Sequence, residues 1–273
     1  MSVPHHKSRL NRTALVVFSG GQDSTTCLHW ALRTFSAVET VFFDYGQRHA
    51  CEERAAQVIT WKLGVPLRRF KVDFFRELGG NSLTDAAMDI DAAGESALPN
   101  TFVPGRNLLF LTQAAAYAYT RGIRDVVTGV CQTDYSGYPD CRHDTIRALQ
   151  RSLHLGLGWP ERHRSADGRS GRGGAFRIHT PLMFRTKAGS VALAQRWGAL
   201  DSLAFSHTCY EGAFPPCGRC PACVLRAKGF AEAGIADPLI TRAAAERAAA
   251  PSPAPDHASG DAGTHAPITP PTS

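Results

Sequence analysis

Short apolar runs alternate with longer segments of mixed apolar and polar residues, from the N-terminal region to about residue 157. The apolar runs are rich in Val, Leu and Phe and have the length of buried strands, whereas the mixed segments repeat their apolar residues with a helical period. Strands are therefore predicted at 13–18, 38–43, 67–72 and 125–130. Helices are predicted at 24–35, 50–63, 106–121, 142–157 and 186–197. Repeated strand–helix units predict an α/β fold, with a parallel sheet flanked by helices on both faces.

The rest of the chain departs from this alternation. Residues 158–177 are rich in Gly and Arg and lack a periodic apolar face, so we expect a flexible basic insertion there. Beyond about Thr241 the composition shifts to Ala, Pro, Ser, His and Thr, which is typical of a disordered tail. The pattern divides the chain into a frayed N-terminus at 1–12, an α/β domain at 13–205, a cysteine-bearing module at 206–240 and a disordered tail at 241–273.

The composition is consistent with a folded α/β domain. Hydrophobic residues make up 43% of the 273 residues, enough for a sizeable core. No apolar run reaches the length that spans a bilayer, and the first one is only as long as a strand before it meets Gly20 and Gly21, unlike the core of a signal peptide. We therefore expect a cytosolic (cytoplasmic) protein without membrane contact.

The net charge of +6 raises the question of a nucleic-acid partner. Five of the arginines lie in the insertion at 158–177, against one Glu and one Asp. Because the positive excess belongs in part to this insertion, it says little about a binding face on the folded core. We expect no nucleic-acid partner.

The turn between the first strand and the first helix is the strongest candidate for chemistry. Residues 19–24 read Ser-Gly-Gly-Gln-Asp-Ser. Glycines let the backbone bring its N–H groups close to an oxyanion, the hydroxyls add donors, and the following helix directs its positive dipole end to the same place. The loop is expected to bind phosphate or pyrophosphate, although neither of the two best-known phosphate-loop patterns is present. The alternative is an ordinary Gly-Gly turn.

Further polar stretches follow the other predicted strands, and such segments meet at one edge of a parallel sheet. Residues 44–49 and 131–142 should therefore converge with 19–24 on one cleft. Segment 131–142 combines Tyr rings, which can stack on a flat heterocycle, with carboxylates that suit the edge of a guanine-like base. Arg106 opens a predicted helix, where a guanidinium is unfavourable to the dipole unless an anion is bound. The alternatives are a solvated loop, an ordinary turn and an Arg paired with a nearby carboxylate.

Four of the eight cysteines are clustered towards the C-terminal part of the chain. They follow the pattern C-x7-C-x2-C-x2-C, at Cys209, Cys217, Cys220 and Cys223. Two C-x2-C steps on a tight turn suit tetrahedral thiolate coordination of zinc, and four thiolates leave no position for a catalytic water. A structural zinc is therefore predicted. An iron–sulfur cluster is the alternative, since closely spaced cysteines serve it too.

Six stretches together resemble one family. In chain order they are FSGGQDSTTCL, FDYGQRH, NTFVPGRN, TGVCQTDYSGYPDCR, TPLM and CGRCPAC, and they span roughly residues 15–230. This set resembles the 7-cyano-7-deazaguanine synthase family of queuosine biosynthesis, within the ATP pyrophosphatase (PP-loop) superfamily. The resemblance implies an adenine nucleotide alpha hydrolase-like fold with a C-terminal zinc-binding helical module. It also implies a carbon–nitrogen ligase that adenylates 7-carboxy-7-deazaguanine, forms its amide with ammonia, and adenylates the amide to release the nitrile.

The same resemblance implies roles for individual residues. Catalytic roles are implied for Asp23, Arg106 and Lys187, with Asp23 as the contact of Mg²⁺. ATP binding is implied for the loop and the start of its helix, namely Phe18, Ser19, Gly20, Gly21, Gln22, Asp23, Ser24, Thr25, Thr26, Cys27 and Leu28. Binding of the deazaguanine is implied for Asp134, Tyr135, Tyr138, Asp140 and Arg142. The implied cofactors are ATP, Mg²⁺ and a structural Zn²⁺, and we expect a homodimer.

Two other functions are open on this basis. A tRNA-modifying sulfur transferase or ligase also uses a pyrophosphate loop, but it needs an RNA-binding module, for which the sequence offers nothing beyond the Arg/Gly-rich insertion. A non-enzymatic zinc-binding module would leave the loop at 19–24 unexplained.

Overall fold

A parallel sheet forms the centre of the part of the chain that the computed structural model describes, which comprises residues 9–47, 51–85, 87–90, 98–131, 138–159 and 174–249. Its strands are Leu10–Val17 (β1), Phe35–Asp44 (β2), Leu67–Lys71 (β3), Asp125–Val127 (β4) and Arg177–His179 (β5). The order across the sheet is β3-β2-β1-β4-β5, and every neighbouring pair is parallel. The predicted α/β fold with a parallel sheet is confirmed.

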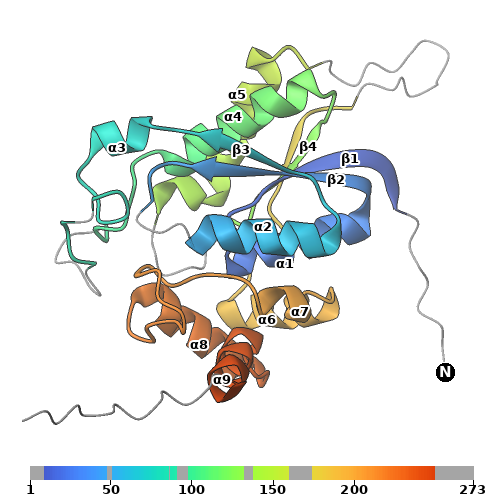
Figure 1. Cartoon of the computed structure of the whole chain (residues 1–273). Helices are drawn as coiled ribbons and strands as arrows, with labels where there is room; N and C mark the ends of the chain where they lie inside the picture. Colours follow the sequence, from blue (N-terminus) through green and yellow to red (C-terminus); the bar gives the residue numbers. More distant parts are fainter. Residues whose placement is uncertain are drawn as a thin grey trace, which may run out of the picture.

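Helices cover both faces of the sheet. Figure 1 shows α1 (Gln22–Thr34) and α2 (Cys51–Leu63) on one side and α4 (Arg106–Thr120) and α5 (His143–Gly156) on the other, with the short α3 (Phe74–Leu78) beyond β3. Successive residues of a strand point to opposite faces. Leu15 accordingly packs in the core beneath α4 and α5, whereas Ala14 and Val16 pack in the core beneath α1 and α2. The second half of the central strand, residues 14–17, is apolar because both faces of the sheet are covered there.

The chain changes direction across the sheet after β3. From β1 it first adds β2 and β3 on one side, and it then returns to place β4 and β5 on the other side. In an open parallel sheet, such a reversal leaves a crevice at the carboxyl ends of the two central strands. The loops that follow β1 and β4 therefore border a site that the topology itself creates.

Several strand boundaries differ from the prediction. Leu10 pairs with Phe35, so the strand begins before residue 13 and the predicted frayed N-terminus does not extend to residue 12. Strand β4 ends at Val127 rather than at residue 130. Strand β5 was not predicted, because its three residues contain a single buried apolar side chain, Ile178, which is too short a pattern to detect.

The C-terminal part of the described chain is helical and lies against α1. Its helices are α6 (Lys187–Arg196), α7 (Leu200–Leu203), α8 (Pro221–Ala233) and α9 (Pro238–Ala249), which Figure 1 shows grouped together. The predicted boundary of the tail at residue 241 is wrong. Leu239 and Ala243 lie one helical turn apart and are both buried, so α9 continues to Ala249. The remainder of the predicted tail, 250–273, lies outside the described residues.

A buried arginine ties these helices together. The guanidinium of Arg226, on α8, donates to both carboxylate oxygens of Asp237, at 2.6 and 2.8 Å. It also donates to Ser206 Oγ at 2.8 Å and to the carbonyl oxygen of Leu203 at 3.2 Å. Breaking one partner of a buried ion pair typically costs about 3–5 kcal/mol. The middle of α8 is therefore held to the end of α7 and to the start of α9.

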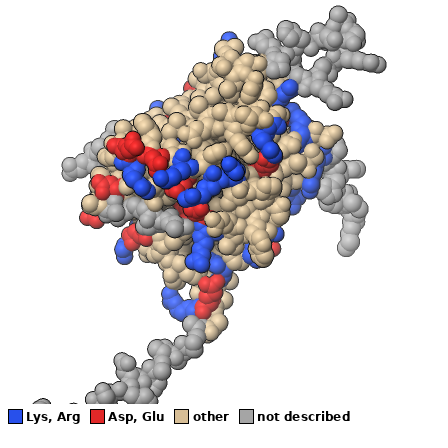
Figure 2. All heavy atoms as spheres, turned by 45° about the horizontal axis from the view of Figure 1, so that its top comes forward, with Lys and Arg blue, Asp and Glu red and all other residues tan. Residues whose placement is uncertain are grey.

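Surface charges are mixed in sign. On the face shown in Figure 2, acidic side chains lie among the basic ones. Arg69, for example, contacts both Asp44 and Glu53, at 2.6 and 2.9 Å. Most of the predicted basic insertion, 160–173, lies outside the described residues. Within the described ranges, no helix has the length and apolar character required to cross a membrane.

Candidate active site

A cavity of about 310 Å³ opens at the carboxyl ends of β1, β2 and β4. It is lined by parts of all three segments that were expected to converge, including Ser19 and Ser24 after β1, Tyr45 and Gln47 after β2, and Tyr138 beyond β4. The predicted convergence is therefore confirmed for the described residues. Arg48 and His49, which belong to the second segment, lie outside them.

The loop after β1 requires glycine for two reasons. Gly20 has a φ of 78°, a conformation that residues with a side chain rarely adopt, and an added Cβ would lie 2.7 Å from the backbone nitrogen of Ala56. Helix α2 therefore packs directly on the loop. On the other side, a Cβ on Gly129 would lie 3.0 Å from the backbone nitrogen of Ser24. These close approaches place the N-terminus of α1 between α2 and the end of β4.

The start of α1 offers polar groups to the cavity. No side chain caps this helix, and Ser19 Oγ lies 3.1 Å from Ser24 Oγ. Gln22 is 2% exposed and lines the cavity, yet its Nε2 has no hydrogen-bond partner among the described residues. A buried donor left without a partner costs free energy, which a bound acceptor such as a phosphate oxygen would recover.

Asp23 and Lys187 form an ion pair in the same cavity. Lys187 Nζ, from the first residue of α6, donates to Asp23 Oδ2 at 2.6 Å. Both side chains are half-buried. The other carboxylate oxygen, Asp23 Oδ1, is buried without a hydrogen-bond partner in the described part of the chain. One oxygen of Asp23 is therefore neutralised by a lysine while the second can accept from a ligand or bind a cation, and this donor fits Mg²⁺.

A guanidinium surrounded by tyrosines lies elsewhere along the cavity. The Cζ atom of Arg106 is 5.7 Å from the ring centre of Tyr45 and 6.0 Å from that of Tyr138. Burial raises the pKa of Tyr45 to about 12, and burial likewise raises the pKa of Tyr210, so both rings stay neutral. Arg106 Nη1 donates to Tyr45 Oη at 3.4 Å, and the other guanidinium N–H groups make no hydrogen bond to the described residues, so they are available to an anion.

Glu52 adds a carboxylate to this group. It lies in the first turn of α2, lines the cavity, and its backbone carbonyl lies against Gly20. Burial raises the pKa of Glu52 to about 7, although the charge of Arg106 opposes this shift. A carboxyl group with such a pKa can exchange a proton near neutral pH.

Five of the residues predicted to bind ATP do not line the cavity, namely Gly20 and the four residues 25–28. Helix α1 turns Thr25, Thr26, Cys27 and Leu28 towards the protein interior, where all four are buried. The Thr26 hydroxyl donates to the carbonyl of Gln22 at 2.9 Å, and the Cys27 thiol donates to that of Thr128 at 3.6 Å. Phe18, Ser19 and 21–24 do line the cavity, and Gly20 lies beneath them.

The predicted substrate contacts are divided. Tyr138 lines the cavity and shares a hydrogen bond of 2.7 Å with Thr101 Oγ1. Asp140 is buried and accepts from the backbone nitrogen of Asn107 at 2.9 Å, so it caps the start of α4 and does not line the cavity. Arg142 is exposed and also lies away from it. Asp134 and Tyr135 lie outside the described residues.

Several residues that line the cavity belong to no motif that is recognisable in the sequence. Glu52, Phe110, His207 and Tyr210 are the clearest examples. Glu52 and Phe110 stand in helical patterns that look like those of any amphipathic helix. His207 and Tyr210 flank the first cysteine of the cluster, and their proximity to that motif was the one available signal.

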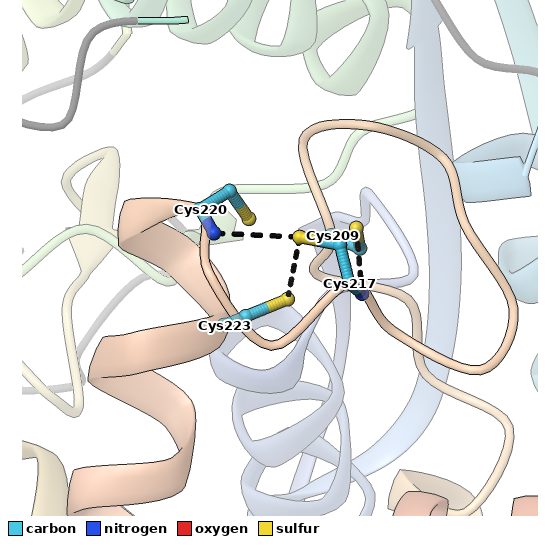
Figure 3. Close-up of side chains that lie close together, drawn as sticks. All are labelled: Cys209, Cys217, Cys220 and Cys223. Atoms are coloured by element: carbon cyan, nitrogen blue, oxygen red, sulfur yellow. Dashed lines mark hydrogen bonds between the residues drawn. The ribbon is translucent and has the colours of Figure 1, made fainter.

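The four clustered cysteines lie close enough to share one metal ion. Their sulfur atoms are all within 4.8 Å of one another, and Figure 3 shows the side chains pointing towards a common centre. A tetrahedral site with metal–sulfur bonds of about 2.3 Å separates its sulfurs by about 3.8 Å. The observed separation of Cys217 Sγ and Cys223 Sγ is 3.9 Å. The hydrogen bond between Cys220 and Cys223 lowers the pKa of Cys220 and raises that of Cys223, so the negative charge of the pair favours the sulfur of Cys220.

Comparisons with known proteins agree with this site. The family model described as queuosine biosynthesis protein QueC matches residues 13–234. The 7-cyano-7-deazaguanine synthase of Laribacter hongkongensis is 57% identical over 233 residues, which cover 85% of this chain and 95% of the relative. That of Chromobacterium violaceum is 57% identical over 237 residues, with the same coverage. A solved structure described as a predicted subunit of tRNA methyltransferase from Methanocaldococcus jannaschii is 12% identical to this chain, with a TM-score of 0.41. The match covers 67% of this chain and 74% of that chain, and the likeness is weak. The family match and the two synthases show that the chain belongs to the QueC family of queuosine biosynthesis proteins.

Proposed function

We propose that the protein converts 7-carboxy-7-deazaguanine and ammonia into 7-cyano-7-deazaguanine at the expense of ATP, as a step of queuosine biosynthesis. The names of its relatives, which are 57% identical, support this reaction. The observation that carries the proposal is the composition of the cavity. One wall is a glycine loop with unpartnered polar groups, and another holds a guanidinium among tyrosine rings. Such a cavity can hold a nucleotide phosphate and a planar carboxylic acid together.

The loop after β1 is assigned to the nucleotide. Backbone N–H groups and the hydroxyls of Ser19 and Ser24 would bind the phosphates that leave as pyrophosphate. Gln22 Nε2 would donate to a phosphate oxygen, since it has no hydrogen-bond partner in the described structure. Asp23 Oδ1 would hold Mg²⁺, which supplies positive charge to the phosphates. Lys187 would then add a second positive charge beside the α-phosphate.

The group around Arg106 is assigned to the deazaguanine acid. The guanidinium can form two parallel hydrogen bonds with a carboxylate, and the ring of Tyr138 can stack on the heterocycle. Asp134, Tyr135, Asp140 and Arg142 remain predicted contacts of the same substrate. Of these, Asp140 has the weakest support, because its carboxylate already caps α4.

Positioning and fixed charge account for the reaction in this scheme. A carboxylate oxygen of the acid attacks the α-phosphorus of ATP, and pyrophosphate leaves. The lone pair of ammonia then attacks the activated carbon, the carbon–oxygen bond to AMP breaks, and a proton is lost to give the amide. A second ATP adenylates the amide oxygen, and loss of AMP and the remaining nitrogen-bound protons gives the nitrile. Glu52, with a pKa of about 7, is suited to accept protons during these steps.

We further propose that the cysteine cluster holds a structural Zn²⁺. Four thiolates would fill the coordination shell, so the metal would stabilise the module and take no part in the chemistry. The reduced state that these thiols need supports a cytoplasmic location. A colourless purified protein with one zinc per chain is expected, whereas a coloured protein containing iron would contradict this assignment.

The homodimer and the absence of a nucleic-acid partner stay predictions. A tRNA-modifying sulfur transferase is not favoured, because the family match and the two relatives point to the deazapurine reaction.

The test is incubation of the purified protein with ATP, ammonia and 7-carboxy-7-deazaguanine, followed by mass spectrometry. We expect AMP, pyrophosphate and the nitrile, with two ATP consumed per nitrile, and no nitrile when ammonia is omitted. Failure of the zinc-loaded protein to release AMP in the presence of all three substrates would overturn the proposal.

A further inference from the structure

Helix α8 packs on α6, and at one position of this contact there is no room for a further carbon atom between the two helices. Gly229 lies in the interior of α8, and a Cβ built on it would lie 2.9 Å from Lys187 Cβ and 3.2 Å from the Lys187 carbonyl carbon. Real Cβ atoms do not approach other atoms this closely. Glycine is also among the least favourable residues in a helix interior, and its use here coincides with this contact.

The residue that Gly229 touches is the one that reaches the nucleotide loop. Lys187 is the first residue of α6, and its Nζ donates to Asp23 Oδ2 at 2.6 Å. The backbone of Lys187 therefore packs on α8, while its ammonium group lies in the cavity beside α1. A displacement of the start of α6 would move this ammonium away from Asp23.

The same helix α8 begins at the cysteine cluster. Cys220 is its N-cap and Cys223 lies in its first turn, so a metal on the cluster would fix the position of the helix. A second connection runs through His207. Its backbone nitrogen donates to the carbonyl of Gly20 at 3.0 Å, and its ring Nε2 lies 3.0 Å from the carbonyl oxygen of Cys209. The cluster is thus linked to both Lys187 and the loop after β1.

We propose that Gly229 is a positioning residue for Lys187. Because glycine lets α8 contact the start of α6 directly, the cysteine cluster at the start of α8 also sets the position of the Lys187 ammonium group that faces Asp23. This inference rests on the proposed nucleotide function of the cavity. It assigns the cluster a role in setting the geometry of the active site in addition to stabilising its own module.

The test compares Gly229→Ala with Gly156→Ala in the full-length, zinc-loaded protein. Gly156 also lies in a helix, but a Cβ there meets nothing within 4 Å, so it is a matched control. Alanine favours helix in both places. We expect Gly156→Ala to leave the Kd for MgATP unchanged. In Gly229→Ala the Kd for MgATP and the KM for ATP should rise roughly tenfold, through loss of a charge-assisted hydrogen bond, with the zinc content and the KM for ammonia unchanged.

The results distinguish failure of the positioning role of Gly229 from failure of nucleotide binding by the cavity. If the unmodified protein fails to bind MgATP, the proposed function of the cavity is contradicted. If it binds MgATP and Gly229→Ala binds it equally well, only the positioning role is overturned.

A folding defect in Gly229→Ala would also be informative. The new methyl group would meet Lys187 Cβ, so Lys187→Gly should restore folding in the double variant by removing that atom. A double variant that stays unfolded while Lys187→Gly alone folds would overturn the proposal. Failure of Lys187→Gly itself to fold would overturn it too, since the lysine would then be a determinant of the fold.

Discussion

The two ends of the cavity are built in different ways. The end proposed for the nucleotide, called the nucleotide end, consists largely of one continuous segment, 19–24, with a glycine bend, two hydroxyls and the start of α1. The end proposed for the deazaguanine acid, called the substrate end, is assembled from side chains of different elements, such as Tyr45, Glu52, Arg106 and Tyr210. The first end can therefore be recognised from a short motif, whereas the second exists only after the sheet and the C-terminal module have brought its parts together.

The largest effect is expected at the nucleotide end. Asp23→Ala removes both the partner of Lys187 and the oxygen proposed for Mg²⁺. We expect kcat for AMP release to fall by roughly 10²–10³-fold, as for the loss of one preorganised polar group in other enzymes. Thermal unfolding should confirm that the variant stays folded. Normal AMP release by a folded Asp23→Ala protein would show that the loop does not act as proposed.

The substrate end should respond differently. Arg106→Lys keeps the positive charge but loses the planar fork that binds a carboxylate through two hydrogen bonds. We expect the KM for the deazaguanine acid to rise roughly 10- to 100-fold while the KM for ATP is unchanged. Arg121→Lys is the comparison, because Arg121 pairs with Glu39 at the surface and does not line the cavity. An equal rise in both KM values for Arg106→Lys would remove the distinction between the two ends.

Glu52 provides a pH test of the substrate end. Its pKa in the folded protein, about 7, is above its ordinary value of 4.5, so folding favours the protonated form. The stability that Glu52 contributes is therefore fully present below about pH 4.5 and is lost as the pH rises through 7. Glu52→Gln should match the wild-type melting temperature at pH 4.5 and exceed it at pH 8.

The neighbouring carboxylate supplies the control for that experiment. Glu53 also lies in the first turn of α2, but it pairs with Arg69 at the surface. Glu53→Gln should not stabilise the protein at pH 8. If Glu52→Gln and Glu53→Gln change the melting temperature in the same way at both pH values, Glu52 is an ordinary carboxylate and its proposed role as a proton acceptor is lost.

The smallest effect concerns a residue that borders the substrate end without lining it. Asp140→Ala removes the acceptor for the Asn107 backbone nitrogen at the start of α4. We expect a loss of about 1 kcal/mol in the free energy of unfolding, as for other helix caps, with both KM values unchanged. Urea unfolding and steady-state kinetics would measure the two quantities. A rise in the KM for the acid without a loss of stability would instead favour the predicted contact with the substrate.

The contrast between the two ends of the cavity also explains which features could be predicted from the sequence. The apolar period identified the central strands, because β1 and β2 are buried and long, but it missed β5, whose three residues hold one buried side chain. The cysteine cluster was identified from its spacing, because cysteines that are only a few residues apart in the sequence can also lie close together in space. Both are local signals.

Other parts of the site depend on tertiary contacts that no local pattern records. Glu52 and its neighbour Glu53 are equivalent in the sequence, and only the packing of α2 on Gly20 turns one of them into the cavity. Asp140 shows the reverse case. It stands in a polar loop typical of a binding site, yet its carboxylate is taken up by the backbone of α4. The segments that border the cavity were therefore predicted correctly, but the individual residues that line it were not.

The most direct test of the central claim is a crystal structure of the protein with 7-carboxy-7-deazaguanine and a non-hydrolysable ATP analogue. We predict that the phosphates lie on residues 19–24, that the acid carboxylate lies on Arg106, and that a carboxylate oxygen faces the α-phosphorus. Phosphates bound away from Gly20 and Gly21, or an acid bound outside the cavity, would contradict the account.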